Sequence, residues 1–415
     1  MSPREEAGRT RGLRRPRLGF SLARSPLGAA MLVLLTLIVA ATVAGLVTLW
    51  PGKIAQPRGL VTTKTLEGQI TAIAEVRCSI QVAAGSGCRV ATVKLLEGPD
   101  KGTTTRLQLA GASGAVDAKV GNRVRVFKTP APPPGTPVSQ RLPPYSFADF
   151  DRRAPMIWLG VAFALLLLVT GRVHGLRALL GLGASLAILL KFVIPSILTG
   201  HSPLAVALVG SFAVLLATIP ISYGLGAKAV AAWLGTAVSL LLALELASVF
   251  TRLAHLTGAT SEDAIFLSAT NAKVSLHGLL LAGMVVGALG VLADLTVSQA
   301  STVIALRRAN PSLGFGGLFR GALDVGHDHI AATVNTLVFA YAGASLPVLL
   351  IFSIGGTPFA DAVNNEAVAE QIVATLVGSI GLIASMPITT ALAAVLATQL
   401  PARALAADAH AGHAH

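Results

Sequence analysis

The chain has 415 residues, of which 53% are hydrophobic and only 12% are charged, and its formal net charge is +13. A soluble domain typically carries about 25% charged residues, so this composition excludes an ordinary soluble protein and indicates that the main partner of the chain is the lipid bilayer. The arginines cluster at the N-terminus and at the ends of apolar runs, as they do in membrane proteins, which argues against nucleic acid as a partner.

The N-terminal region predicts a basic cytoplasmic segment followed by a membrane anchor. Residues 1–24 are polar and rich in arginine, and residues 25–51 contain an apolar run from Leu27 to Leu49. This run is longer than the ~7–15 residues of a signal-peptide core, and it can cross ~30 Å of hydrocarbon. We therefore expect an uncleaved transmembrane helix, with a cleaved signal peptide as the competing interpretation.

Residues 52–130 have a different character. Alternating stretches rich in valine, isoleucine and threonine, at 68–76, 89–95 and 123–127, predict β-strands. About five short strands in such a segment predict a small β-barrel-like domain, similar to an OB-type barrel. The proline-rich stretch within 131–155 predicts a stiff linker that returns to the membrane.

Both cysteines of the chain lie in this hydrophilic segment. Cys78 and Cys88 flank a glycine-containing turn between two predicted strands. Because disulfides form outside the cytoplasm, we expect a disulfide that closes this hairpin, with two free thiols as the alternative.

Residues 156–400 predict a seven-helix membrane core, so the fold class is an all-α polytopic membrane protein with about eight transmembrane helices in total. The seven apolar runs lie near 156–171, 178–199, 204–225, 229–250, 278–298, 329–353 and 372–399. Lysine and arginine recur in alternate loops, which the positive-inside rule assigns to the cytoplasm. We therefore expect a plasma-membrane protein with both termini in the cytoplasm, including the histidine-containing tail at 401–415, and with residues 52–155 outside it.

One face of the run at 278–298 combines small residues with an acidic one. Its members recur at spacings of four, three and four, on one side of a helix: Gly283, Gly287, Gly290 and Asp294. The glycines predict close packing against another helix. Asp294, expected near the cytoplasmic end, is a candidate ligand for a cation or a proton; the alternative is an interfacial acid on a packing face.

A second polar group stands at the predicted start of the run at 329–353. Its members are Asp324, His327, Asp328, His329 and Asn335. Carboxylates and imidazoles together can hold a divalent cation or relay protons. Since both runs meet on the cytoplasmic side, we expect Asp294, Asp324 and Asp328 to gather in one acidic pocket, with His327 and Asn335 as further candidates for an ion or proton site. The alternatives are polar capping of the helix N-terminus and neutralisation by arginines of the connecting loop.

Two single charges lie deep inside apolar runs, Lys191 and Glu245. A lone charge at membrane depth is costly, and the two lie at comparable depth, so we predict an intramembrane ion pair. The sequence has no P-loop, no serine nucleophile elbow, no HExxH and no CxxC. We therefore expect no enzymatic activity, and no cofactor beyond a divalent cation at the acidic site.

Several stretches of the chain carry a family pattern: 287–294, 310–311, 326–328, 335–347 and, before the core, 145–150. In these stretches the chain resembles the YibE/F family of bacterial multi-pass membrane proteins. The resemblance implies one helix, an external domain and a polytopic core, with polar residues at Asp294, Asp328 and Asn335. It implies no particular activity.

Charges inside apolar runs favour a transporter or permease of unknown solute, in which Asp294 and Asp328 bind a cation or a proton. Asn335 and Tyr341 would line the route. The rival hypothesis is an envelope interaction protein, whose β domain binds an envelope or membrane protein partner and whose helices anchor it; a solid core with both aspartates tied to arginines would distinguish it. A membrane enzyme, the third hypothesis, requires a histidine to converge with the aspartates on a metal.

Overall fold

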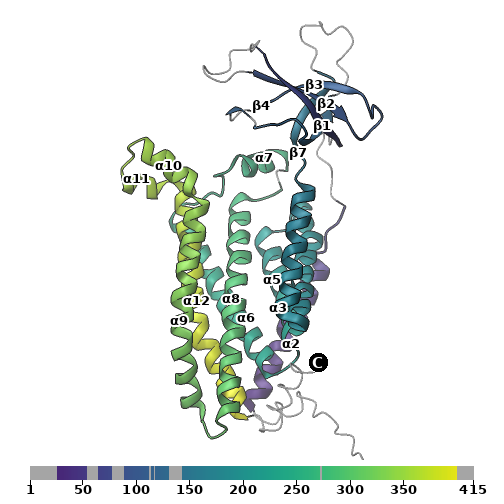
Figure 1. Cartoon of the computed structure of the whole chain (residues 1–415). Coiled ribbons are helices and arrows are strands. Elements are labelled where there is room, and N and C mark those ends of the chain that lie inside the picture. The colour runs from purple at the N-terminus through teal and green to yellow at the C-terminus, as the bar shows by residue number, and fades with distance from the viewer. Residues whose placement is uncertain are drawn as a thin grey trace, which may run out of the picture. The chain divides into compact units, whose positions relative to one another are not determined.

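The structure is a computed structural model, which describes residues 26–53, 64–76, 88–111, 114–115, 117–129, 143–271 and 273–399. The chain divides into two compact units (Figure 1). One unit, Arg58–Thr170, holds the strands, and the other, Met1–Pro57 with Gly171–His415, holds most of the helices.

The smaller unit is built on an antiparallel sheet in the order β3-β2-β1-β6-β7. Its strands are β1 (Thr65–Val76), β2 (Cys88–Leu95), β3 (Thr104–Gln108), β6 (Arg123–Lys128) and β7 (Tyr145–Phe150). A short hairpin, β4 (Ala110–Gly111) with β5 (Gly114–Ala115), follows β3. The outer strands β3 and β7 approach each other, but no ladder joins them among the described strands. The sheet is therefore a curled half-barrel, and the predicted barrel is confirmed only to that extent.

Strand alternation produces the core of this unit. In β6, Val124 and Val126 are buried while Arg123 and Lys128 are exposed, because successive side chains of a strand point to opposite faces. Ile70 of the central strand β1 is buried in the same cluster. The strands predicted at the β1, β2 and β6 positions are confirmed.

β7 lies where the sequence predicts a linker. Tyr145–Phe150 pair with β6, with a register shift between Arg125 and Val126, and Tyr145 packs into the core. The strand begins directly after Pro144, the end of a run of prolines, and proline is rare inside strands. The prediction of a linker over 131–155 is therefore wrong at β7.

A polar cluster ties three elements of this unit together. Asp100, in the turn between β2 and β3, accepts a hydrogen bond from the Tyr145 hydroxyl, and its Oδ2 lies 2.9 Å from Lys128 Nζ. The Tyr145 hydroxyl and then the Lys128 ammonium hold the pKa of Asp100 below its ordinary value. In return, the hydrogen bond to Asp100 raises the pKa of Lys128. The folded unit thus favours the ionised form of the Asp100 side chain.

Asp100→Asn is expected to destabilise the protein at neutral pH and to have little effect in acid. A carboxylate whose pKa is lower in the folded state adds stability above its unfolded pKa of about 3.9, and that stability is lost as the pH falls through the lower folded pKa. Thermal unfolding of the full-length protein and the variant, at neutral pH and at about pH 3, measures the change. Asp117→Asn, at an exposed pair with Lys119, is the control. An Asp100→Asn effect of equal size at both pH values would contradict the prediction.

The larger unit is a helical bundle. Its helices, besides the second part of α3, are α2 (Pro26–Thr48), α5 (Pro203–Tyr223), α6 (Ala227–Leu253), α7 (Glu262–Thr270), α8 (Leu276–Ala309), α9 (Phe315–Ala344), α10 (Leu346–Ile354), α11 (Phe359–Asn364) and α12 (Glu366–Gln399). α6, α8 and α12 pack most extensively on one another, around fully or almost fully buried leucines such as Leu234, Leu292 and Leu382. α9 packs on α12 and α8, α5 packs on α8, and α2 packs on α5 (Figure 1).

α3 (Arg153–Ile188) passes from one unit into the other and is broken at Arg172, whose φ of 46° and ψ of −123° are not helical. It continues into the π-helix η2 (Leu189–Val193) and into α4 (Ile194–Leu198). The two helices predicted at 156–171 and 178–199 therefore lie in one helical stretch, Arg153–Leu198, which has a non-helical residue at Arg172.

Six helices of the described part are long and apolar enough to cross a membrane, with Arg153–Leu198 counted once. α9 and α10 meet at a bend of 60° and make a seventh if together they form one span. The predicted total of about eight is not confirmed, because it requires a division of α3 at Arg172. The predicted positions of α2, α5 and α6 agree with the structure to within a few residues.

α9 begins much earlier than the sequence predicts. The helix starts at Phe315, after Gly314, and ends at the bend around Ser345, where Pro347 follows in α10. The polar stretch at 324–329 led to a predicted start at 329, yet a helix carries polar side chains readily on an exposed face. These residues lie inside α9, so the interpretation that they cap its N-terminus is wrong.

Candidate functional site

The candidate site is a contact between a carboxylate and an imidazole. Asp294 Oδ2 of α8 lies 3.9 Å from His329 Nε2 of α9. The Asp294 side chain is 74% exposed and that of His329 is 38% exposed, although Nε2 itself is buried and has no hydrogen-bond partner in the described part of the chain. The distance exceeds that of a direct hydrogen bond, so a bridging water or a small side-chain rotation would complete the pair.

Asp294 lies in the middle of α8 and not near its end. The helix continues to Ala309, beyond the end at 298 that the sequence predicts. The carboxylate is therefore exposed in the interior of a long apolar helix, where contact with lipid would be costly. This position requires water, a counter-charge or a protein partner at the Asp294 side chain.

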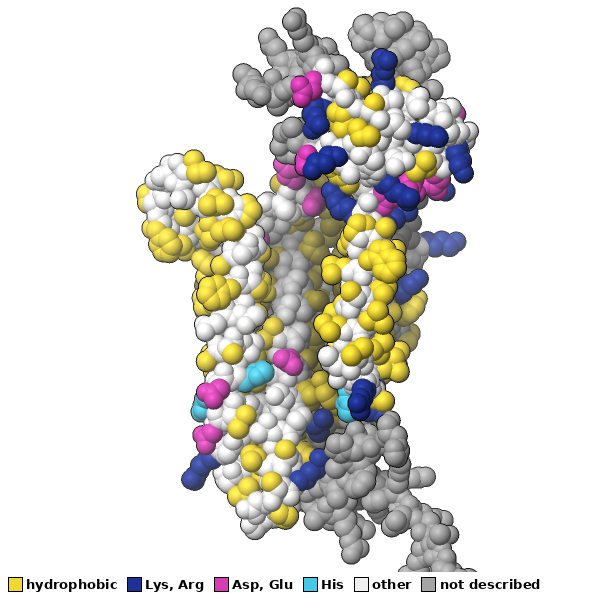
Figure 2. Space-filling view, viewed as in Figure 1, with side chains coloured by type: hydrophobic (Ala, Val, Ile, Leu, Met, Phe, Trp, Pro, Cys, Tyr) yellow, Lys and Arg dark blue, Asp and Glu magenta, His cyan; other side chains and the backbone are white. Residues whose placement is uncertain are grey.

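Gly283, Gly287 and Gly290 of α8 have almost no contact with another helix in the described structure. A Cβ built on Gly283 or Gly290 would meet nothing within 4 Å, and one built on Gly287 would meet only the Tyr341 hydroxyl, at 3.3 Å. The prediction of close packing is therefore wrong, and the glycines leave an open face that leads to Asp294. Figure 2 shows acidic and histidine side chains together over α8 and α9, beside surface that bears no charge.

Helices approach closely at several other glycines, and the two tightest approaches are at Gly235 and Gly326. A Cβ on Gly235 of α6 would lie 2.0 Å from Thr389 Oγ1 of α12. A Cβ on Gly326 of α9 would lie 2.3 Å from Gln299 Nε2 of α8. Each glycine stands outside the repeated spacing that the sequence analysis used, which is why it was missed.

A buried polar seam (Thr236, Thr296, Gln299 and Thr390) joins α6, α8 and α12. The hydroxyl oxygens of Thr236 and Thr296 are 2.6 Å apart, and Thr390 Oγ1 donates to Gln299 Oε1 at 3.1 Å. Uncharged polar residues within apolar runs are the signal that could have predicted it, since such side chains hydrogen-bond between membrane helices.

The other residues predicted for the site make no described ion contact with Asp294. Four of these residues lie along α9 with exposed side chains: Asp324, His327, Asp328 and Asn335. The described residues hold no group of three or more histidine, cysteine, aspartate or glutamate side chains that could bind a metal ion. His329 alone of the α9 group forms a described ion contact with Asp294. Arg307 lies in the last turn of α8, and it donates to the carbonyl groups of Pro311 and Leu313 and so fastens the loop that follows.

The predicted ion pair between Lys191 and Glu245 is not among the described salt bridges, and both residues are exposed. Lys191 lies in η2 and lines a cavity against α2 and α5. Glu245 lies on α6, which packs mainly on α8 and α12. Similar depth does not bring two residues together when their helices have different neighbours, so this prediction is wrong.

The predicted disulfide cannot be placed, because Cys78 lies outside the described residues. It stays a prediction for Cys78 and Cys88. The basic segment 1–24 and the tail 401–415 also lie outside the described residues.

Two glutamates that the sequence analysis did not single out hold the loop after α6. Glu366 accepts hydrogen bonds from the Thr257 backbone and hydroxyl and from Gly258 N. Glu370 is 7% exposed; its Oε2 accepts from Thr260 Oγ1 at 2.8 Å, and its Oε1 is buried with no partner in the described part. They were missed because the sequence predicts a start of α12 at 372, which leaves both glutamates in a loop.

The fold and the site define a class: a bundle of long helices, each apolar enough to cross a membrane, with polar groups inside the bundle and a separate half-barrel. The family model described as YibE/F-like protein matches residues 159–399, which is more than half of the chain. The protein therefore belongs to the YibE/F-like family, as the sequence patterns indicate. Comparisons with curated proteins and with solved structures give no match.

Proposed function

We propose that the protein is a multi-pass membrane transporter of a solute not yet known, in which the open face of α8 and α9 lines the path of a proton or a cation. The observation that carries this proposal is Asp294, an exposed carboxylate in the middle of an apolar helix, 3.9 Å from His329. Ionisable residues within membrane helices face cavities or partners, and chains of acidic and histidine side chains relay protons in transporters.

The proposed topology has eight spans, with α3 divided at Arg172. Arg153–Leu198 has 46 residues, and at ~1.5 Å per residue it would extend ~69 Å as one straight helix, more than twice the ~30 Å of the hydrocarbon core. The apolar side chains of its first part are exposed, with Trp158 at 71% and Val169 at 76%, as lipid contact requires. Arginine-bearing loops then fall on the cytoplasmic side.

Space for a path is present beside the open face. A cavity of about 330 Å³ borders Gly290 and is lined mainly by apolar side chains of α3, η2, α5 and α8, with Ser185, Ser211 and Thr218 among its polar residues. The glycines of α8 leave room because they have no side chains, and the Tyr341 hydroxyl is directed at Gly287. A proton that reaches Asp294 would have His329 Nε2 as its next acceptor.

Asp294→Asn and His329→Gln are expected to slow proton movement through the protein by about tenfold, the factor that corresponds to about 1.4 kcal/mol. The protein and each variant are reconstituted into liposomes that contain a pH-sensitive dye, and a pH gradient is imposed. Asp361→Asn, an exposed acid of α11 away from this face, is the control. Thermal stability across metal ions and pH values is compared in parallel.

Proton movement no faster than in protein-free liposomes would reject a proton path. Metal-dependent stabilisation that disappears in Asp294→Asn would then support a cation as cargo. If neither is seen and Asp294→Asn is simply less stable, the site is structural. The protein would then be better explained as an envelope interaction protein that binds a partner through its half-barrel.

A further inference from the structure

A cavity of about 560 Å³ lies between α2, the end of α3 with η2, and α5. Apart from Thr42 and Lys191, the described side chains that line it are hydrophobic. The Thr42 hydroxyl already donates to the Ile38 carbonyl at 2.7 Å. Binding pockets of ~300–1,000 Å³ typically combine apolar walls with a few polar groups that orient the ligand. In this cavity the Lys191 ammonium is the group that can orient a ligand.

The charge of Lys191 has no counter-charge in the described part of the chain. None of the described ion pairs or side-chain hydrogen bonds involves it. Lys191 lies seven residues before the end of α4 at Leu198, which corresponds to ~10 Å along the helix. A lone charge at this depth in a membrane is costly. An anion from outside the chain would remove that cost.

The helix is irregular at this lysine for a reason found in the sequence. In a regular α-helix the N–H of residue 195 would donate to the carbonyl of residue 191, but Pro195 has no N–H. The chain forms a π-turn instead, in which Ile194 N donates to the Leu189 carbonyl five residues back. Single π-turns inside α-helices are frequent at functional sites. Here the irregular turn coincides with the residue that carries the charge.

The walls of the cavity reach the surface of the bundle. Val43 of α2 is 53% exposed, and Trp50, which follows α2, is 60% exposed. The Trp50 ring packs on the buried Phe192, with ring centres 6.1 Å apart. The proposed topology puts this end of α2 at the outer surface of the membrane, where tryptophan rings lie at the level of the lipid headgroups. A lipid can therefore enter from the side with its headgroup near Trp50.

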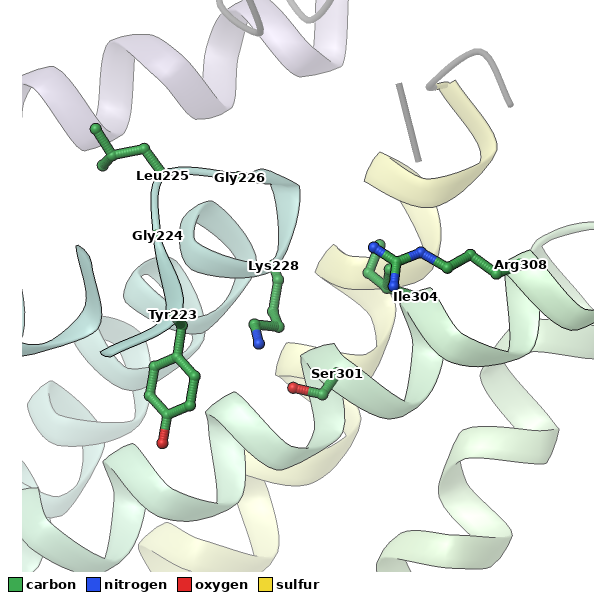
Figure 3. A pocket seen from close by; sticks show the side chains of 8 residues that line it. All are labelled: Tyr223, Gly224, Leu225, Gly226, Lys228, Ser301, Ile304 and Arg308. Atoms are coloured by element: carbon green, nitrogen blue, oxygen red, sulfur yellow. The ribbon is translucent and has the colours of Figure 1, made fainter. Parts of the chain in front are cut away.

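The cationic cavity between the α5–α6 loop and α8 differs in this respect (Figure 3). Lys228 and Arg308 line it, and both have interaction partners of their own. The Ser301 hydroxyl donates to the Val297 carbonyl at 2.6 Å. Of the two cavities, the one at Lys191 has the cation that is available to a ligand.

We infer that the cavity between α2, η2 and α5 binds an anionic phospholipid, with one acyl chain along its hydrophobic walls and the phosphate at the Lys191 ammonium. A neutral lipid would fill the walls but leave the ammonium without a counter-charge. The flexible stem of a lysine lets its ammonium reach towards the headgroups. The outer leaflet as the source of this lipid rests on the proposed topology. The binding itself does not, and no group of the proposed proton path lines this cavity.

The test measures lipid binding to the delipidated full-length protein in a neutral detergent. The probes are a short-chain phosphatidylglycerol and the phosphatidylcholine with the same chains, and the readouts are native mass spectrometry and the shift of the unfolding temperature. Lys191→Met replaces the ammonium by an apolar group of similar length, and Ala187→Phe fills the cavity from α3. The matched controls are Lys53→Gln and Ala178→Phe, at exposed residues outside the lining.

Wild type and both controls are expected to bind one phosphatidylglycerol about tenfold more tightly than phosphatidylcholine, since a charged hydrogen bond is added. Lys191→Met should bind the two lipids alike, at the affinity of phosphatidylcholine. Ala187→Phe should bind both lipids about tenfold more weakly, because the added ring occupies the space of the acyl chain.

Equal affinity of the wild type for the two lipids would overturn the site, and so would an unchanged preference in Lys191→Met. An equal loss of preference in Lys53→Gln would assign the effect to general surface charge and overturn it as well. A dimer that Ala187→Phe converts into monomers would assign the cavity to a second copy of the chain instead of a lipid. If Lys191→Met does not fold, equal lipid binding by Ala187→Phe and Ala178→Phe overturns the proposal.

Discussion

Gly235→Ala is expected to destabilise the protein by about 2 kcal/mol, because the added methyl group has no room. It would lie 2.0 Å from Thr389 Oγ1, 2.9 Å from Thr389 Cβ and 3.1 Å from Cγ2. Rotation about χ1 can move the hydroxyl and the methyl group of Thr389, but it cannot move Cβ. α6 and α12 must therefore move apart at this point.

Two other glycine-to-alanine variants provide a comparison for this loss of stability. Gly326→Ala meets Gln299 Nε2 and Met386 Sδ, which lie towards the ends of flexible side chains, so a smaller loss is expected. Gly290→Ala meets nothing within 4 Å and should be neutral or stabilising, by up to about 1 kcal/mol from helix propensity. Thermal unfolding in one detergent ranks the three variants. A large loss in Gly290→Ala would show that the α8 glycine face is covered in the native protein.

Glu366→Ala is expected to cost about 2 kcal/mol, because three hydrogen bonds to one carboxylate are lost. Two of the donors are backbone N–H groups, of Thr257 and Gly258, and Gly258 has a φ of +78°. Without the Glu366 carboxylate, the loop that follows α6 keeps the hydrogen bond of Thr260 to Glu370 but loses its three hydrogen bonds to Glu366 of α12. Hydrogen exchange of residues 254–261, together with thermal unfolding, should show faster exchange confined to that loop.

Glu370→Gln provides the matched comparison, one helical turn away. The amide oxygen can still accept the hydrogen bond from Thr260, and the substitution removes a buried charge that has an unpaired oxygen. Burial of an unpaired charge is unfavourable, so this variant should be as stable as wild type or more stable. A loss equal to that of Glu366→Ala would mean that the Glu370 charge has a partner in the native protein.

The sequence predicts the individual helices better than their contacts. α2, α5 and α6 follow from apolar runs bounded by polar residues, which is local information. The contact between Asp294 and His329 depends on how α8 and α9 are rotated about their axes, and it appears only once α9 starts at Phe315. Neighbours in sequence such as Asp328 point about 100° away from His329 on a helix.

The glycines of α8 are a second case in which the sequence predicts a helix face but not its contacts. Spacings of three and four correctly place Gly283, Gly287 and Gly290 on one side of α8, but they do not say whether another helix covers that side. The tight contact occurs at Gly235, whose neighbour Thr389 is far away in sequence. The strand β7 was missed for a different reason. The prolines before Tyr145 predicted a linker, and the strand is recognised only from its pairing with β6.

The break in α3 falls on a charged residue, and this has a consequence for the topology. A left-handed backbone conformation costs an arginine roughly 1–2 kcal/mol, whereas the preceding residue, Gly171, could adopt it without that penalty. Because the break lies at Arg172 instead, a positive charge stands at the break itself. Arg177 follows less than two helical turns later. In the proposed eight-span topology, the positive charge that marks this turn as cytoplasmic and the turn itself belong to one residue. In that topology the turn cannot shift along the helix into the hydrocarbon without carrying its charge there.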